Sequence, residues 1–282
     1  MTATVAIVAG RGTLPGRLAR ALEDDGARVV IAALEGVTLD LAPGREVIRF
    51  RLERLGALFD ALRQAGVARV IFAGGINRPR INPARLDYRT AALLPRLLSA
   101  LRGGDDHALR VVVEVFEREG FAVVGAHEIL PDLLAAPGVI TRATPNAADK
   151  ADAARAACVV AALSDLDVGQ GAVVAQGMVL AIETAPGTDR MLDWVAETAG
   201  AWRPDPQGAR GVLFKGPKRG QERRMDLPTI GPDTVTGAAG AGLAGIVVEA
   251  GGVIVLDRPA VVAACDASGL FLWARPPEWE DG

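Results

Sequence analysis

Hydrophobic residues in the first half of the chain fall alternately into short unbroken runs and into helical spacing. Four short apolar runs predict buried strands: residues 5–10, 28–34, 69–75 and 121–127. Between them, apolar side chains recur every three or four residues, and Gly26 and Gly66 stand where two of these helices should end. Strands that alternate with helices predict a parallel, doubly wound sheet with right-handed crossovers.

The second half restarts this alternation after residues 132–147, a stretch rich in Pro, Ala and Thr with no clear period. A helix is expected at 148–164, and further helices begin at Thr188 and near Pro259. Short apolar runs between and after these helices predict strands. Glycines between neighbouring strands predict two hairpins, at Gly177 and at Gly251–Gly252.

Length and composition fit two ordinary domains. Half of the 282 residues are hydrophobic but only 4% are aromatic, so the cores must be built from Ala, Val, Leu and Ile. Such cores suit helices packed on a largely parallel sheet. We divide the chain into an N-terminal ligand-binding domain at 1–131, a linker at 132–147 and a C-terminal α/β catalytic domain at 148–282.

Charge and cysteine content exclude several classes of protein. The net charge of −3 argues against a non-specific nucleic-acid binder, which needs a basic face. Cys158 and Cys265 lie far apart among Ala and Val, so we expect two reduced, buried thiols and no zinc site. No apolar stretch approaches the length of a membrane span or forms a signal peptide, which favours the cytoplasm, with any membrane contact peripheral.

A glycine-rich turn, AGRGTLPG, joins the first predicted strand to the first helix. Such a turn lets backbone N–H groups at a helix N-terminus approach a phosphate, and Glu35, about 20 residues further on, would suit a dinucleotide. The spacing of Gly10, Gly12 and Gly16 is one residue longer than the dinucleotide fingerprint, and Pro15 interrupts it. Three interpretations stay open: a tight turn without ligand, a nucleotide or sugar-phosphate contact, and NAD binding.

A second glycine pair, Gly74 and Gly75, ends the third predicted strand, where open α/β sheets bind ligands. Asn77 follows it, and the segment is equally well explained as an ordinary loop. Further on, Asp105 and Asp106 suggest a metal site at first sight. Carboxylates at a helix N-terminus more often cap the helix, which is the interpretation that we favour.

The segment LFKGPKRGQERRMDLPTIG carries the densest charge in the second half. Its cations, which include Lys215, can offset a diphosphate, and the carboxylate of Asp226 can hold Mg²⁺ that bridges phosphate oxygens. Pro228 stiffens the turn that would aim this carboxylate. A surface loop with mutually paired charges explains the same residues. Thr188 and Asp189 open a helix and are explained as an ordinary N-cap, and Glu183 as a solvent-facing strand residue.

Several segments together resemble one bacterial family. GGDDHALR, DVGQGAVVAQGMVLAIETAPGTDRML, FKGPKRGQERRMDLPTIGPDTV and AGLAGIVVEAG occur in the order and spacing of the UDP-2,3-diacylglucosamine pyrophosphatases of lipid A biosynthesis, in the form unrelated to metallophosphoesterases. The resemblance covers nearly the whole chain. Two positions depart from it: Gly75 stands where the family often has asparagine, with Asn77 two residues later, and Pro186 stands where Glu or Gln is more usual.

The resemblance implies hydrolysis of UDP-2,3-diacylglucosamine to 2,3-diacylglucosamine 1-phosphate and UMP with Mg²⁺. It implies a homodimer of chains with a Rossmann-like N-terminal sheet, a C-terminal α/β domain and the ligand in the cleft between them. Asp226 would then be the essential catalytic residue and metal ligand, with Lys215 stabilising charge. The substrate contacts that it implies are Gly10, Gly12, Gly74, Gly75, Asn77, Gln170, Thr188, Asp189 and Gln221.

Two other functions remain as alternatives at this stage. An NAD(P)-dependent oxidoreductase would use the N-terminal glycine loop and Glu35. A non-catalytic nucleotide or lipid carrier would bind the same ligand without turnover.

Overall fold

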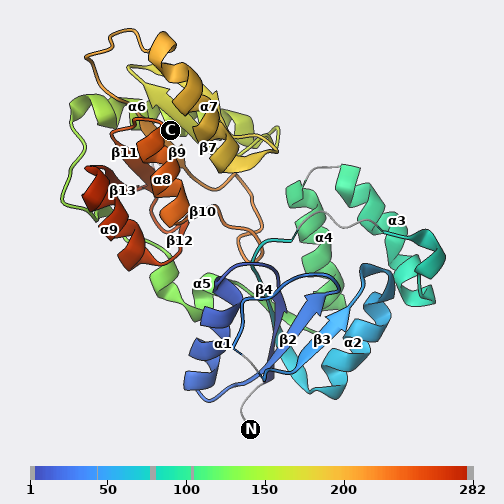
Figure 1. Ribbon diagram of the computed structural model, residues 1–282. Coiled ribbons are helices and arrows are strands. Elements are labelled where there is room, and N and C mark those ends of the chain that lie inside the picture. Colours follow the sequence, from blue (N-terminus) through green and yellow to red (C-terminus); the bar gives the residue numbers. More distant parts are fainter. Residues whose placement is uncertain (1–3, 43, 77–80, 103–104, 278–282) are drawn as a thin grey trace. The chain divides into compact units, whose positions relative to one another are not determined.

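The computed structural model describes residues 4–42, 44–76, 81–102 and 105–277 (Figure 1). The chain divides into two compact units. Unit 1 comprises Met1–Pro131 together with Glu222–Asp226, and unit 2 comprises Asp132–Gln221 together with Leu227–Gly282. Residues 132–147, interpreted above as a linker, therefore belong to unit 2, and the five residues that end at Asp226 belong to unit 1.

Unit 1 is built on a parallel sheet, as the alternation of strands and helices predicted. The strand order is β3–β2–β1–β4–β5, and every neighbouring pair is parallel. The strands are β1 (Thr4–Ala9), β2 (Arg28–Leu34), β3 (Val47–Phe50), β4 (Val67–Ala73) and β5 (Ala122–Val124). This order is that of a Rossmann-like sheet, whose topological switch point lies between β1 and β4. The sequence missed β3 because it has only four residues, and Arg49 in it is exposed.

Helices pack on the sheet of unit 1 through an aliphatic and phenylalanine core. The helical segments are α1 (Leu14–Asp24), η1 (Leu52–Arg54), α2 (Leu55–Gln64), η2 (Pro83–Arg85), α3 (Tyr88–Arg102), α4 (Asp105–Arg118) and α5 (Ala126–Ile129). Phe116 on α4 packs edge-on against Phe59 on α2 and against Phe72 on β4, with ring centroids 5.1 and 5.0 Å apart. These contacts hold α2 and α4 on one face of the sheet.

Unit 2 contains a six-stranded mixed sheet in the order β6–β13–β11–β9–β7–β8. Its strands are β6 (Gly138–Val139), β7 (Gly171–Ala175), β8 (Met178–Ile182), β9 (Val212–Lys215), β11 (Gly245–Glu249) and β13 (Phe271–Arg275). The central strands β9, β11 and β13 are parallel, and the outer strands run antiparallel to their neighbours. The carboxyl ends of β9, β11 and β13 therefore share one edge of the sheet.

Helices cover both faces of this sheet, which confirms an α/β fold for unit 2. The helical segments are η3 (Pro131–Leu133), α6 (Ala147–Ser164), α7 (Gly187–Trp202), α8 (Pro232–Gly240) and α9 (Arg258–Ser268). One buried cluster joins α6 to one face, and a larger cluster joins α7, α8 and α9 to the other. The sequence missed α8 because PDTVTGAAG contains too few large apolar residues to show helical spacing.

One of the two predicted hairpins is confirmed and the other is wrong. β7 and β8 pair antiparallel around Gln176 and Gly177, both of which have positive φ, as a two-residue hairpin turn requires. The segment after Gly251–Gly252 does not fold back on β11. It forms β12 (Ile254–Val255), which pairs in parallel with β10 (Thr229–Ile230) because the backbone N–H of Ile254 bonds to the carbonyl oxygen of Pro228.

The two cysteines differ from each other in burial. Cys265 is buried on α9, and burial raises the pKa of its thiol to about 11, so it stays protonated and inert. Cys158 is exposed on α6, so the prediction of a buried thiol was wrong there. Its helix position turns it away from the sheet, although Ala156 and Ala157 beside it are buried.

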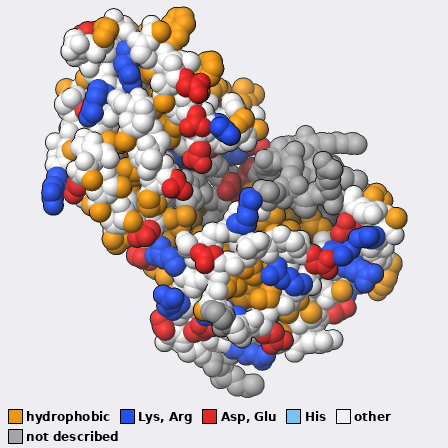
Figure 2. All heavy atoms as spheres, viewed as in Figure 1, with side chains coloured by type: hydrophobic (Ala, Val, Ile, Leu, Met, Phe, Trp, Pro, Cys, Tyr) orange, Lys and Arg blue, Asp and Glu red, His pale blue; other side chains and the backbone are white. Residues whose placement is uncertain are grey.

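The surface mixes charges of both signs. Figure 2 shows basic and acidic side chains interspersed over the described part of the face in view. None of the helices in the described part of the chain is both long and apolar enough to cross a membrane.

Candidate active site

A buried lysine marks the carboxyl end of the sheet in unit 2. Lys215 is the last residue of β9, and only 5% of its side chain is exposed. Its ammonium group donates to Oγ1 of Thr188 at 2.6 Å and lies 3.2 Å from Oε2 of Glu183. Because a buried charge is costly unless paired, these contacts stabilise the ammonium ion inside the fold. The structure thus brings Lys215 and Thr188 together.

The GQG motif at residues 169–171 leads into β7, and its two glycines leave space for Glu183 to pack. A Cβ atom at Gly171 would lie 2.6 Å from Oε2 of Glu183, and one at Gly169 would lie 2.0 Å from the carbonyl oxygen of that residue. Gln170, between the two glycines, accepts a backbone hydrogen bond from Gly216, which follows Lys215. The motif therefore holds the carboxylate of Glu183 against the end of β9.

Two interpretations of this region need correction. Glu183 is not a solvent-facing residue, because its side chain is 14% exposed and faces Lys215. Thr188 is not the N-cap of α7, since Pro186 holds that position and makes no side-chain cap bond. The hydroxyl of Thr188 instead accepts a hydrogen bond from the ammonium group of Lys215. Asp189 lies in the first turn of α7 and is exposed.

The loop after β9 is held by side-chain contacts of its own. The ammonium group of Lys218 pairs with Asp167, and the backbone N–H of Lys218 donates to Oε1 of Gln221 at 2.8 Å. Gln221 is buried, so its side chain closes this turn. The candidate substrate contact at Gln221 has, at minimum, a structural role.

The next five residues pack in unit 1, which no local pattern predicted. The backbone N–H of Glu222 donates to Oδ1 of Asp106 at 2.9 Å, and Arg224 donates to Glu117 at 2.7 Å. Met225 packs against the core of unit 1. Asp226 ends the segment half-buried, with its backbone N–H bonded to the carbonyl oxygen of Glu222 at 3.1 Å. The position of Asp226 is therefore set by contacts made with α4.

Asp106 is one of the anchors of this segment. We favoured helix capping for it, but its carboxylate accepts from Glu222 and also pairs with Arg110 one turn along α4. Asp106 is buried, and the segment that it holds is 116 residues away in sequence. The side chain of Asp105 lies outside the described residues.

The charged residues around Asp226 pair largely with one another. Arg224 makes two hydrogen bonds of 2.8 Å to the carboxylate of Glu222, in addition to its bond to Glu117. The hydrogen bonds from Arg224 lower the pKa of Glu222, and Glu222 in turn raises the pKa of Arg224. Both groups are charged at neutral pH, so the pair stiffens the turn before Asp226.

The glycine loops of unit 1 meet at the carboxyl ends of β1 and β4. A Cβ atom at Gly10 would lie 2.6 Å from backbone atoms of Gly74 and Gly75, and Arg11 and Gly75 exchange two backbone hydrogen bonds. The structure thus places all four predicted glycines at the topological switch point, where such sheets bind ligands. Gly10 and Gly74 are required for the loops to touch, whereas Gly12 and Gly75 face open space. Asn77 lies outside the described residues.

A pair of buried charges escaped the sequence analysis. Glu249 and Arg275 end β11 and β13, are register partners, and are almost fully buried. A Cβ atom at Gly252 would lie 2.7 Å from Oε1 of Glu249. One sequence signal could have revealed this pair, because a charged residue ends each of the apolar runs GIVVE and FLWAR. Both residues lie at the same edge of the sheet as Lys215.

We predict that Asp106→Ala displaces the segment that carries Asp226. It leaves the backbone N–H of Glu222 without its acceptor, which should cost about 1–3 kcal/mol in the free energy of unfolding. The misplacement should lower kcat roughly ten- to hundred-fold. Steady-state kinetics and urea unfolding measure the two effects. Asp106→Asn is the matched control, because it keeps the acceptor oxygen, and activity equal to wild type in Asp106→Ala would contradict the prediction.

The fold and these groups define a two-unit α/β protein with a buried, paired lysine in one unit and two touching glycine loops at the switch point of the sheet in the other. Models of the LpxI N-terminal and C-terminal domains match residues 4–133 and 136–273. The chain belongs to the LpxI family.

Two known proteins illustrate its similarities. The chain is 42% identical over 275 residues to the UDP-2,3-diacylglucosamine pyrophosphatase LpxI of Caulobacter vibrioides. The aligned region covers 96% of this chain and 97% of that protein. Among solved structures, CobK precorrin-6A reductase aligns with 98% of this chain and 88% of its own at 18% identity. Its TM-score of 0.34 is too low to support an argument about function.

Proposed function

We propose that this chain hydrolyses the diphosphate of UDP-2,3-diacylglucosamine to 2,3-diacylglucosamine 1-phosphate and UMP. The activity named for the Caulobacter relative supports this reaction, and so does the family to which the chain belongs. The structural observation that carries the proposal is the buried ammonium group of Lys215 on Thr188, at the first turn of a helix. The oxidoreductase alternative has no comparable support.

Lys215 is equipped to stabilise negative charge on a phosphate. An ammonium group has three N–H donors; one of them donates to Thr188, and the ammonium ion also forms an ion pair with Glu183 at 3.2 Å. Another donor can reach a phosphate oxygen without loss of the bond to Thr188 or of the ion pair. The N-terminus of α7, which carries Thr188, adds free backbone N–H groups and a partial positive charge. Because these donors are fixed before the ligand arrives, little reorganisation is needed in the transition state.

Asp226 is the residue that we propose to hold Mg²⁺. Among the described residues, no three His, Cys, Asp or Glu side chains gather into a metal cluster. A single carboxylate, that of Asp226, fits Mg²⁺, because this ion commonly takes one or two protein carboxylates and completes its shell with phosphate oxygens and water. When bound, the ion would offset phosphate charge and lower the pKa of a coordinated water. Asp106, Glu222 and Arg224 orient the segment that presents the carboxylate.

The further substrate contacts that we propose are Gly12 and Gly75 in unit 1 and Gln170, Asp189 and Gln221 in unit 2. A phosphate or sugar could approach the backbone closely at both glycines, because a Cβ atom at either would face open space. We also propose a homodimer and a peripheral contact with the cytoplasmic face of a membrane, since the substrate carries two acyl chains. Trp194 and Trp202 on α7 are exposed, and tryptophan suits a membrane interface.

Metal removal tests this proposal. Wild-type protein treated with EDTA should lose release of UMP from UDP-2,3-diacylglucosamine, and added Mg²⁺ should restore it. The product is measured by chromatography, with a buffer-exchanged sample as the control for irreversible unfolding. UMP release that is unchanged in excess EDTA would contradict the proposed role of Mg²⁺.

A further inference from the structure

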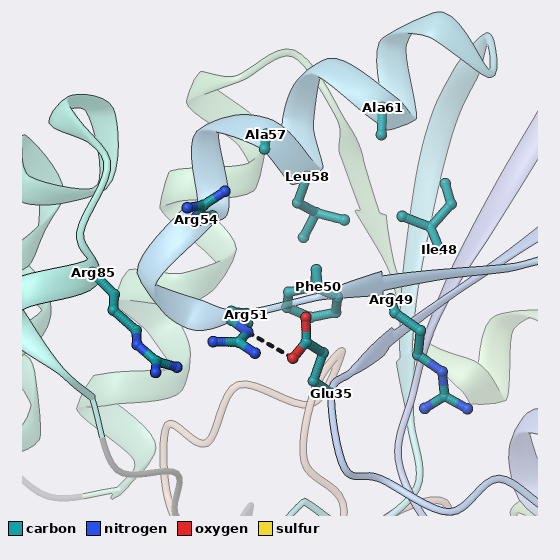
Figure 3. A pocket seen from close by; sticks show the side chains of 10 residues that line it. All are labelled: Glu35, Ile48, Arg49, Phe50, Arg51, Arg54, Ala57, Leu58, Ala61 and Arg85. Carbon is teal, nitrogen blue, oxygen red and sulfur yellow. Dashed lines mark hydrogen bonds and ion pairs between the residues drawn. The ribbon is translucent and has the colours of Figure 1, made fainter.

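A cavity in unit 1 lies beside the carboxyl ends of β2 and β3. Its volume is about 680 Å³, which is within the range of small-molecule sites. Figure 3 shows the lining: α2 forms one wall, the strand end that carries Phe50 lies opposite, and arginine side chains surround the opening. The cavity is separate in sequence from the glycine loops and from every residue used in the mechanism above.

One end of this cavity is strongly basic. Arg51, Arg54 and Arg85 line it, and Glu35 is the acidic residue among the lining side chains. Nε of Arg51 donates to Oε2 of Glu35 at 2.6 Å. Within the part of the chain that the structure describes, the guanidinium group of Arg54 makes no hydrogen bond or ion pair. The cavity therefore offers cationic donors that the protein itself does not satisfy.

A nearby buried carboxylate reduces this excess charge only in part. Glu53 accepts a hydrogen bond from the backbone N–H of Asn82 at 2.8 Å, which lowers the pKa of the carboxyl, and the charges of Arg51 and Arg85 lower it further. Glu53 is therefore ionised at neutral pH. The guanidinium groups of Arg51, Arg54 and Arg85 still outnumber the two carboxylates, so a ligand that fills the cavity should carry negative charge.

The other end of the cavity is apolar. Ala57, Leu58 and Ala61 of α2 face Ile48 of β3 across it, and the two alanines leave the space between the helix and the strand open (Figure 3). Such a slot accepts a flat ring, which can also stack on a guanidinium plane. A simple inorganic anion would leave this half unfilled, so the two ends together fit a ligand with a ring and a phosphate.

We propose that this cavity binds a nucleoside phosphate. Its base would lie in the slot between α2 and β3, its ribose hydroxyls would donate to Glu35, and Arg54 and Arg85 would donate to phosphate oxygens. Glu35 follows β2, where a carboxylate in sheets of this order meets ribose hydroxyls. Two sources share this chemistry: the nucleotidyl half of the substrate, an assignment that rests on the proposed function, and a free nucleotide.

Binding of UMP to the full-length protein tests the proposal. Isothermal titration should show UMP bound by the wild type, and the double variant Arg54→Gln/Arg85→Gln should bind it at least about ten-fold more weakly, because two charged hydrogen bonds are lost. Both arginines are exposed, so folding should be unaffected. Arg20→Gln, an exposed arginine on α1, is the matched control and should bind as wild type.

A second variant separates the base from the phosphate. Ala57→Leu fills the apolar slot without altering charge, so it should weaken UMP while leaving the weak binding of inorganic phosphate unchanged. If the wild type does not bind UMP, or if either variant binds UMP as the wild type does, the proposal is wrong.

Kinetics then identify the source of the nucleotide. If the substrate occupies the cavity, the double arginine variant raises KM for UDP-2,3-diacylglucosamine; if a free nucleotide does, KM stays unchanged while UMP binding is lost. Failure of the proposed function is a different result, because a wild type that released no UMP from the substrate could still bind UMP in this cavity.

Discussion

Asp226→Asn is expected to lower kcat about a thousand-fold while leaving substrate binding nearly intact. An amide of the same shape carries no charge, so it would hold Mg²⁺ weakly, and a loss of this size corresponds to about 4 kcal/mol of transition-state stabilisation. KM should change little because, under the proposed function, the residue would contact the metal and not the lipid. Steady-state release of UMP and equilibrium binding of the substrate to the variant measure the two effects.

The control for this variant is Asp24→Asn at the exposed end of α1, which should turn over as wild type. Unfolding by urea should give the same midpoint for Asp226→Asn as for wild type, since the backbone N–H of Glu222 and the side chain of Arg224 still hold the segment on α4. Turnover within ten-fold of wild type would show that Asp226 is not the metal ligand.

Lys215→Met is expected to damage both stability and catalysis. The substitution leaves the carboxylate of Glu183 buried without its counter-charge, which should cost about 3–5 kcal/mol in the free energy of unfolding. Turnover should fall at least about a hundred-fold, because the donor that we propose to stabilise phosphate charge is lost. Urea unfolding and UMP release measure the two losses separately.

The double variant Lys215→Met/Glu183→Gln distinguishes a catalytic lysine from a structural one. It removes the unpaired charge, so most of the lost stability should return. If Lys215 acts on the substrate, turnover should stay low in this stable protein. Recovery of turnover together with stability would mean that Lys215 only neutralises Glu183.

The parallel sheet of unit 1 was predictable because its central strands are buried on both sides. Every residue of β1 is buried, so the strand is a continuous apolar run that composition alone reveals. The short elements were not predictable. β10 and β12 have two residues each, and they pair because of contacts made by Pro228 rather than because of their own sequence.

The candidate site was predictable in its residue types more than in its contacts. The motif around Asp226 made this residue a candidate, but the hydrogen bond from Glu222 to Asp106 joins residues far apart in the chain and leaves no local pattern. Glu183 and Thr188 suit ordinary strand and helix-start positions, and only the fold shows that both face Lys215. Glycine is required at Gly10 and Gly171 for steric reasons. A Cβ atom at Gly10 would clash with the backbone of a distant loop, and one at Gly171 would clash with the carboxylate of Glu183.

The most direct test of the proposed reaction is product analysis with purified wild-type protein, UDP-2,3-diacylglucosamine and Mg²⁺. Mass spectrometry and chromatography should find UMP and 2,3-diacylglucosamine 1-phosphate in equal amounts, which grow together as substrate disappears. Release of UDP with the free lipid sugar, or intact substrate after prolonged incubation with folded protein, would contradict the account.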